Sequence, residues 1–324
     1  MLKQISIGSI GGTISMTTSH KNQGITPSLE AQDFIQSIPQ IASIAKIRAS
    51  ALFAIASGHI CFSHLLQVYE WAKNEIENGS QAIIITQGTD TLEESSFFLS
   101  LLWDETAPLI LTGAMKSPSA LGADGIANLY SSILVALHHK AQGVMVVMNN
   151  TIHNPLWLQK THSLALETFS SFHQEFGIIL EDEVEFFKIP KVLKTYKIKN
   201  LTKKVFAYEH KLDDEKEILE WAGEHYDGII IGGYGAGHTN LNTLPIIETL
   251  ATKIPTIMCA RTHQGPSAIK TYGYSGGEID LQKKGVIMSR WLQIKKARIL
   301  LYVLLNAGFS KEEFIYYRDL ITQK

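Results

Sequence analysis

The chain has 324 residues, of which 45% are hydrophobic and 19% charged, and its formal net charge is −2. This length and apolar content allow a large core and favour two domains rather than one. The near-neutral charge gives no reason to expect a nucleic acid or an anionic membrane as partner. The first residues enter a strand pattern without a secretory signal, and no apolar stretch is long enough to span a bilayer, so we expect a cytoplasmic protein.

The first half of the chain alternates strand-like and helix-like stretches. Repeated strand–turn–helix units with short connections predict a doubly wound, mainly parallel sheet. Strands are predicted over residues 5–10, 47–56, 82–85, 108–111 and 143–148, and helices over residues 29–38, 63–77 and 92–103. The polar residues 15–24 follow a Gly11-Gly12-Thr13 turn, and we expect them to form a mobile lid beside it.

Residues 181–204 are rich in lysine and interrupt this alternation, which is typical of a solvated linker. We therefore predict a domain over residues 1–188, a linker over residues 189–204 and a second domain over residues 205–324. The second domain repeats the pattern on a smaller scale. Its predicted strands cover residues 205–208, 228–231 and 256–258, and its predicted helices cover residues 215–223 and 296–306. The predicted fold class is α/β, with a larger N-terminal doubly wound domain and a smaller C-terminal α/β domain.

The two cysteines, Cys61 and Cys259, both lie in apolar stretches. This setting predicts buried free thiols in preference to a disulfide.

Residues 82–94 are the most informative stretch. Residues 82–85 are an apolar run that predicts a strand buried on both faces of a parallel sheet. The next residues supply a glycine turn, and Asp90 or Thr91 is then expected to cap a helix with Glu93 or Glu94 three residues later. A well-capped turn is the plain interpretation. The alternative is a ligand site, because open α/β folds bind ligands at the carboxyl ends of their strands.

The ends of parallel strands gather at one edge of a sheet, so other turns should join this one. We expect Thr13, Ser57, Thr89 with Asp90, and the turn over residues 112–114 to surround a single crevice. A threonine hydroxyl becomes a useful nucleophile only when a base or a cation activates it. Lys160 is the candidate cation, although a lysine in such a polar segment is more often a surface charge.

Several motifs now form a series with a recognisable order and spacing. They are Gly11-Gly12-Thr13-Ile14, Gln87-Gly88-Thr89-Asp90-Thr91-Leu92-Glu93-Glu94, Thr112-Gly113-Ala114-Met115, Asp124-Gly125 with Asn128-Leu129-Tyr130, Lys160-Thr161 and Lys296-Ala297-Arg298. The series resembles that of the bacterial-type L-asparaginase/glutaminase family over nearly the whole chain. The resemblance implies a two-domain amidohydrolase acting on a small-molecule amide. It also implies no metal or organic cofactor, and a homotetramer built as a dimer of dimers.

The resemblance also implies roles for individual residues. Thr13 corresponds to the nucleophile, and Thr89, Asp90 and Lys160 correspond to a second catalytic group in which the lysine favours the ionised threonine. Which threonine attacks first stays open. Ser57 corresponds to a ligand for the substrate α-carboxylate, and Asp90 to a ligand for the α-ammonium.

Further residues of the implied substrate site lie in both domains. Backbone N–H groups at Gly88 and Thr89, or at Ala114, are suited to stabilise an oxyanion. In the C-terminal domain, Glu278 corresponds to a carboxylate that completes a neighbouring subunit's site. His238 is either a further donor to that site or a structural histidine. Four glycines within residues 273–285 predict a shaped loop around this glutamate.

The chain departs from the family pattern at three positions. Ile25 replaces a lid tyrosine, and Tyr272 or Tyr274 is a candidate to supply the missing hydroxyl. Gly58 replaces a glutamine, which leaves a roomier site, and His238 replaces an asparagine. Three hypotheses follow: an asparaginase with glutamine as a slower substrate, a hydrolase of another small amide, and a catalytically impaired amino-acid-binding regulatory protein.

Overall fold

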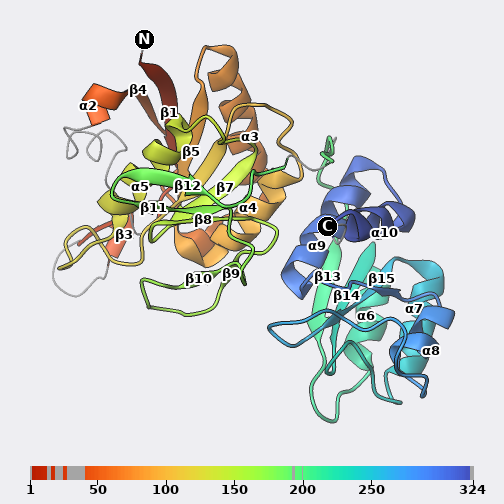
Figure 1. Cartoon of the computed structure of the whole chain (residues 1–324). Helices are drawn as coiled ribbons and strands as arrows, with labels where there is room; N and C mark the ends of the chain where they lie inside the picture. Colours follow the sequence, from red (N-terminus) through yellow and green to blue (C-terminus); the bar gives the residue numbers. More distant parts are fainter. Residues whose placement is uncertain are drawn as a thin grey trace. The chain divides into compact units, whose positions relative to one another are not determined.

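The computed structural model describes residues 2–12, 16–18, 25–27, 41–191, 194–198 and 200–321. The chain divides into two compact units, Met1–Thr195 and Tyr196–Lys324, which Figure 1 shows. Thr13, the predicted helix over residues 29–38 and most of the predicted lid lie outside the described residues. β2 (Met16–Thr18), within the predicted lid, pairs with β3 (Ile25–Pro27), just after it, in an antiparallel hairpin.

An eight-stranded sheet forms the centre of the first unit, in the spatial order β12-β11-β8-β7-β6-β5-β1-β4. The strands from β4 to β7 in this order are parallel, and the β8, β11 and β12 edge is antiparallel. The strands are β1 (Lys3–Ser9), β4 (Ala45–Ala51), β5 (Ala82–Thr86), β6 (Leu109–Thr112), β7 (Val144–Met148), β8 (Thr151–His153), β11 (Gly177–Leu180) and β12 (Glu183–Phe186). A further hairpin joins β9 (Gln159–Lys160) to β10 (Phe169–Ser170).

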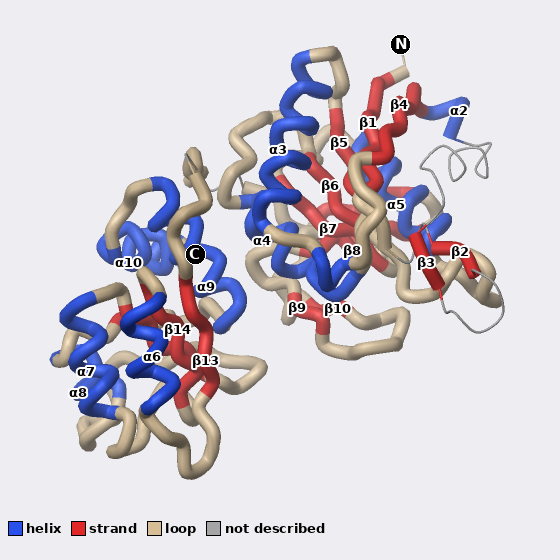
Figure 2. The backbone as a smooth tube through the Cα atoms, turned by 180° about the vertical axis from the view of Figure 1, so that it is seen from behind, coloured by secondary structure: helices blue, strands red, loops and turns tan. Residues whose placement is uncertain are grey.

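Helices cover both faces of this sheet, as Figure 2 shows. α5 (Gly125–Leu137) packs through Leu129 and Ile133 onto the face that carries Ile7 and Ile84. α3 (Phe62–Glu77) and α4 (Leu92–Ser100) contact the strands too, and Trp71 of α3 lies so close to Gly8 that a Cβ there would be 2.7 Å from its ring. Because Gly8 and Ile7 point to opposite faces, α3 lies on the face opposite α5. All five residues of β5 are buried, as the apolar run predicts.

The N-terminal predictions fail mainly where strands end. β4 stops at Ala51 and not at residue 56, because the N–H groups of Leu52 and Phe53 both turn to the carbonyl of Ser9. α4 likewise stops at Ser100, before the predicted end at residue 103. β12 occupies part of the lysine-rich stretch that was expected to be irregular. α2 (Ile41–Ile44) precedes β4.

The second unit is built on a four-stranded parallel sheet in the order β13-β14-β15-β16. Leu219, Ile247 and Leu281 of the flanking helices pack with Ile229, Ile231 and Met258 of the strands. Its strands are β13 (Val205–Glu209), β14 (Gly228–Gly233), β15 (Thr256–Ala260) and β16 (Ile287–Met288). Its helices are α6 (Glu217–His225), α7 (Leu244–Lys253), α8 (Glu278–Lys283), α9 (Ile294–Ala307) and α10 (Lys311–Leu320). The predicted α/β class, with a larger, mainly parallel N-terminal unit and a smaller C-terminal unit, is confirmed.

Two local predictions in these units are wrong. The stretch around Glu278 was expected to be a loop, but the glycines flank a short helix, α8, and Gly277 serves as its N-cap. Cys259 is buried as expected, whereas Cys61 is exposed at the N-cap of α3, where its Sγ lies 3.1 Å from Nδ1 of His64. Both cysteines are free. Among the described residues, no helix combines the length and the apolar character of a membrane span.

Candidate active site

Turns at the carboxyl ends of the parallel strands press against one another in the first unit. A Cβ on Gly12 would lie 2.0 Å from the backbone nitrogen of Gly88, and a Cβ on Gly113 would lie 2.5 Å from the carbonyl oxygen of Gln87. Gly88 in turn lies so close to Ser57 that its Cβ would be 2.8 Å from the serine Oγ. Only glycine allows backbones to approach this closely. The glycines therefore bring the turns after β1, β5 and β6, together with Ser57, to one place.

Lys160 reaches this place and is not a free surface charge. Its Nζ donates to Oγ1 of Thr89 at 2.9 Å and to Oδ1 of Asp90 at 2.7 Å. Ser57 donates from its Oγ to the other carboxylate oxygen of Asp90 at 3.0 Å. Ser57 and Thr89 are buried, whereas the Asp90 side chain is 71% exposed. The cluster thus has a buried hydroxyl in contact with a cation, and a carboxylate that solvent and a small ligand can reach.

The charge state of Asp90 follows from these contacts. The hydrogen bond from Lys160 is the main cause that lowers the pKa of the Asp90 carboxyl, and the Ser57 hydroxyl acts in the same direction. Asp90 is therefore ionised at neutral pH and can bind a cationic group such as an ammonium. The adjacent ammonium of Lys160 favours the alkoxide form of Thr89, because a positive charge at hydrogen-bond distance stabilises the negative oxygen.

Thr91 is the N-cap residue of α4, one of the two residues expected there, but the expected capping hydrogen bond from its side chain is absent. A short 3-10 turn, Thr89–Thr91, precedes α4, and no side chain caps the helix. The Asp90 carboxylate is engaged by Lys160 and Ser57, and the Thr91 hydroxyl donates to the carbonyl of Ser57 at 3.0 Å. Glu93 accepts the backbone N–H of Lys160 at 2.7 Å. Residues with the sequence signature of a cap therefore contact Lys160 and Ser57 instead.

Asp124 and Asn128, which belong to one of the sequence motifs, hold the turn that carries Ala114. The Asp124 carboxylate accepts the backbone N–H groups of Met115 and Lys116 at 2.9–3.1 Å. Buried Asn128 donates to the carbonyl of Gly113 and to Asp124, both at 3.0 Å. Sequence reasoning placed these two residues in a motif without giving them a task. Their contacts show that they fix the backbone of the Gly113-Ala114 turn.

Gly58 differs from the other glycines of the site. A Cβ at this position would meet no atom within 4 Å. The residue is exposed and next to Ser57, so the space that a longer side chain would fill is open beside the crevice.

His238 and Glu278 lie together in the second unit. Glu278 is buried and accepts the backbone N–H groups of Thr271 at 2.5 Å and Tyr272 at 2.7 Å. Burial opposes its ionisation, but these N–H donors prevail and hold the pKa of the carboxyl below its ordinary value. Its Oε2 lies 3.2 Å from Nε2 of His238, an ion-pair distance without hydrogen-bond geometry. The hydroxyl of Tyr274 lies 2.7 Å from Nδ1 of the same histidine.

This cluster presents tyrosines to solvent, not the bare glutamate. Tyr272 and Tyr274 are 45% and 53% exposed, and both rings contact the His238 ring edge to face. Burial and the nearby Glu278 charge raise the pKa of the Tyr274 hydroxyl, so it stays protonated at neutral pH. Of the two tyrosines considered as replacements for a lid hydroxyl, Tyr274 is the one that hydrogen-bonds to a titratable side chain.

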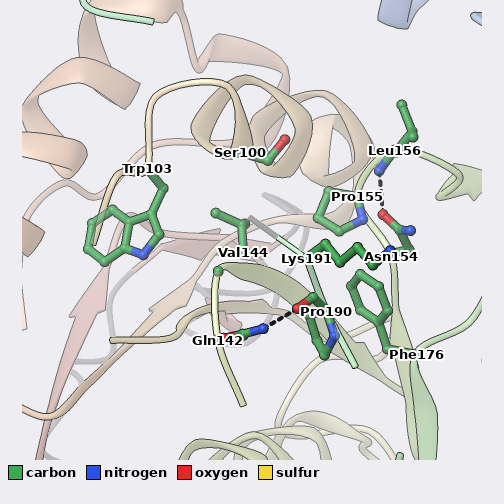
Figure 3. A pocket seen from close by; sticks show the side chains of 11 residues that line it. Ser100, Trp103, Gln142, Val144, Asn154, Pro155, Leu156, Phe176, Pro190 and Lys191 are labelled. Atoms are coloured by element: carbon green, nitrogen blue, oxygen red, sulfur yellow. Dashed lines mark hydrogen bonds between the residues drawn. The ribbon is translucent and has the colours of Figure 1, made fainter. Parts of the chain in front are cut away.

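A separate hollow of about 410 Å³, its open mouth included, lies at the other end of the sheet. Figure 3 shows Val144, the first residue of β7, in its wall together with Trp103, Phe176 and Pro190. Its lining contains none of the predicted site residues. Within the described part of the chain, no three His, Cys, Asp or Glu side chains come together in a way that could hold a metal ion.

Comparisons with known proteins agree with this arrangement. Residues 4–191 match the domain family described as asparaginase, N-terminal, and residues 204–315 match the glutaminase/asparaginase C-terminal domain. The chain belongs to the asparaginase family. The resemblance seen in the motifs is thereby confirmed.

Individual relatives of this asparaginase-family chain match it from end to end. It is 31% identical to a probable L-asparaginase of Deinococcus radiodurans, over 96% of each chain. It is 30% identical to an L-asparaginase of Bacillus licheniformis, over 98% of this chain and 100% of that one. The crystal structure of a probable cytoplasmic L-asparaginase from Campylobacter jejuni superposes with a TM-score of 0.87 at 28% identity, covering 98% of this chain and 99% of that one.

Proposed function

We propose that the chain is an L-asparaginase, which hydrolyses L-asparagine to L-aspartate and ammonia. The observation that carries the proposal is the contact of Lys160 with both Thr89 and Asp90 beside the glycine-lined crevice. A module that only bound an amino acid would need the carboxylate for the ammonium group. It would have no use for a threonine hydroxyl that a lysine activates.

In the proposed reaction, the Thr13 oxygen attacks the side-chain carboxamide carbon, and backbone N–H groups at Gly88 and Thr89, or at Ala114, stabilise the oxyanion. The carbon–nitrogen bond breaks, ammonia leaves with the proton that the Thr13 hydroxyl gave up, and an ester with Thr13 remains. Thr89, prepared by Lys160, then accepts a proton from water, and the resulting hydroxide hydrolyses the ester to aspartate. Thr89 passes the proton to the departing Thr13 oxygen, which restores the Thr13 hydroxyl.

Two groups hold the substrate in this scheme. Asp90 binds the α-ammonium through its exposed carboxylate, and Ser57 binds the α-carboxylate. The unfilled space at Gly58 supports glutamine, which is one methylene longer, as a slower second substrate. No cofactor is required.

The proposed assembly is a homotetramer made as a dimer of dimers, in which the cluster of His238, Glu278, Tyr272 and Tyr274 completes a neighbour's site. The proposed domains of each chain are residues 1–188 and 205–324, joined by a linker over residues 189–204. The proposed location is the cytoplasm, and the proposed partners are small amides rather than nucleic acid or membrane.

Ammonia release from a panel of amides tests this function. The purified protein should release ammonia fastest from L-asparagine and more slowly from L-glutamine, and Thr13→Ala should release none while keeping its melting temperature. Preference for another amide would favour the second hypothesis, a hydrolase of different specificity. Binding of asparagine or aspartate without any release would favour a regulatory protein. Light scattering on the same samples gives the subunit number.

A further inference from the structure

Glu93 occupies an unusual position for a carboxylate. It lies in the first turn of α4 and is 2% exposed, yet its Oε2 accepts a backbone N–H from a residue 67 positions later in the chain, Lys160, at 2.7 Å. This hydrogen bond joins two residues that are far apart in the sequence. The bond therefore ties the helix to the hairpin of β9 and β10.

The 3-10 turn just before α4 holds the other end of the lysine. Thr89 and Asp90 accept hydrogen bonds from Nζ of Lys160, while Glu93 accepts one from its backbone. β9 has only two residues, and such a short strand cannot fix a long side chain by its own ladder. Accepting the proposed function, we propose that Glu93 is a positioning residue: its carboxylate fixes the Lys160 backbone so that the ammonium meets Thr89.

Without the Glu93 carboxylate, the backbone N–H of Lys160 loses its acceptor, and β9 can move away from α4. A misplacement of about 1 Å at a catalytic group costs on the order of 100-fold in rate. Glu93→Ala should therefore lower kcat by roughly 10- to 100-fold. KM for asparagine should change by less than about 3-fold, because Ser57 and Asp90 still hold the substrate. Glu93→Gln places an amide oxygen at the same distance, so it should restore most of the kcat that the alanine variant loses.

The direct test measures the position of Lys160 without using activity. A trace of acetic anhydride labels accessible amines, and mass spectrometry gives the labelling rate of each lysine. The Lys160 side chain is 13% exposed, and Lys73, which is 26% exposed and paired with Asp104 and Glu105, serves as the internal reference. Glu93→Ala should raise Lys160 labelling by about 10-fold relative to Lys73, whereas Glu93→Gln should not. Glu70→Ala, at an exposed glutamate of α3, is the control and should change neither labelling nor kcat.

The outcomes separate this proposal from the function on which it rests. If the wild-type protein released no ammonia, the labelling ratio would still decide whether Glu93 positions Lys160. A folded Glu93→Ala protein with unchanged Lys160 labelling and unchanged kcat overturns the proposal. Equal losses of kcat in the alanine and glutamine variants also overturn it, because the geometry would then not be the cause. If Glu93→Ala fails to fold, Glu93→Asp, whose carboxylate is one methylene short, gives the same labelling comparison.

Discussion

Replacing Lys160 by methionine should abolish turnover and leave the fold intact. Methionine has nearly the length of the lysine stem but lacks the ammonium, so the change removes the donor that lies 2.9 Å from Thr89 Oγ1 and 2.7 Å from Asp90 Oδ1. A well-placed acid–base group contributes about 100- to 10,000-fold. The corresponding increase in the activation free energy is roughly 3–5 kcal/mol.

The expected loss of stability is much smaller. Lys160 pairs with a carboxylate whose side chain is 71% exposed, so water replaces most of the lost interaction. Exposed ion pairs contribute about 0–1 kcal/mol. The free energy of unfolding should therefore fall by no more than about 1 kcal/mol. A large loss of rate with a small loss of stability is the signature of a residue that acts on the reaction and not on the fold.

The assay combines single-turnover ammonia release with urea denaturation of the same samples. Lys73→Met is the matched control, because Lys73 also pairs with two carboxylates, Asp104 at 3.1 Å and Glu105 at 3.0 Å, outside the crevice. It should keep full activity. If Lys160→Met kept more than a tenth of the wild-type rate, the lysine would not be the activating group, and Thr89 would need another.

Three further predictions concern the oligomer, the tyrosine and the pH dependence of stability. Mixed oligomers of Thr13→Ala and Glu278→Ala subunits, each inactive alone, should recover part of the ammonia release, and folded mixtures without recovery would exclude a shared site. Tyr274→Phe should slow single-turnover acylation by about 100-fold if its hydroxyl relays a proton, and an unchanged rate would assign that proton to water or to the lysine–threonine pair. Burial lowers the pKa of His153 from 6.5 to about 4. As pH falls, the His153 ring therefore stays neutral in the native state, whereas it takes up a proton in the unfolded chain. Stability should thus decline between pH 6.5 and pH 4, by up to about 3 kcal/mol, and His153→Asn should flatten this decline in urea titrations at pH 7 and pH 5.

The strands that are buried on both faces of a sheet were predicted best from the sequence. β5, β6, β7 and β14 are runs of apolar residues, and each appears within about two residues of its predicted bounds. The meeting of the turns after β1, β5 and β6 was predicted because parallel strands have their carboxyl ends at the same edge of a sheet. The ends of elements were predicted less well, because β4 stops where two N–H groups turn to Ser9, a contact between distant residues that local patterns do not encode.

The contacts of charged side chains could not be predicted from local patterns. Asp90 and Glu93 have the spacing of helix caps. Instead of capping α4, they accept hydrogen bonds from Lys160, which is 67 residues or more away in the sequence. Glu278 shows the same limit, since flanking glycines suggested a loop while Gly277 instead opens α8. Propensity describes what a segment does alone, and in these places partners from elsewhere in the chain decide the outcome.

Close contacts between turns explain why glycine occupies three positions of the site. At Gly12, Gly88 and Gly113 a Cβ would lie within 2.8 Å of a neighbouring turn, so no side chain can be added there without moving backbone or Ser57. The backbone N–H groups of these turns are fixed donors that would cost little reorganisation during the proposed reaction. Gly58, in contrast to these three glycines, has open space around it, and its φ lies outside the region that favours glycine. A substitution at Gly58 should therefore leave the packed turns undisturbed while changing the selectivity between amides of different length, which ammonia release from asparagine and glutamine by Gly58 variants would measure.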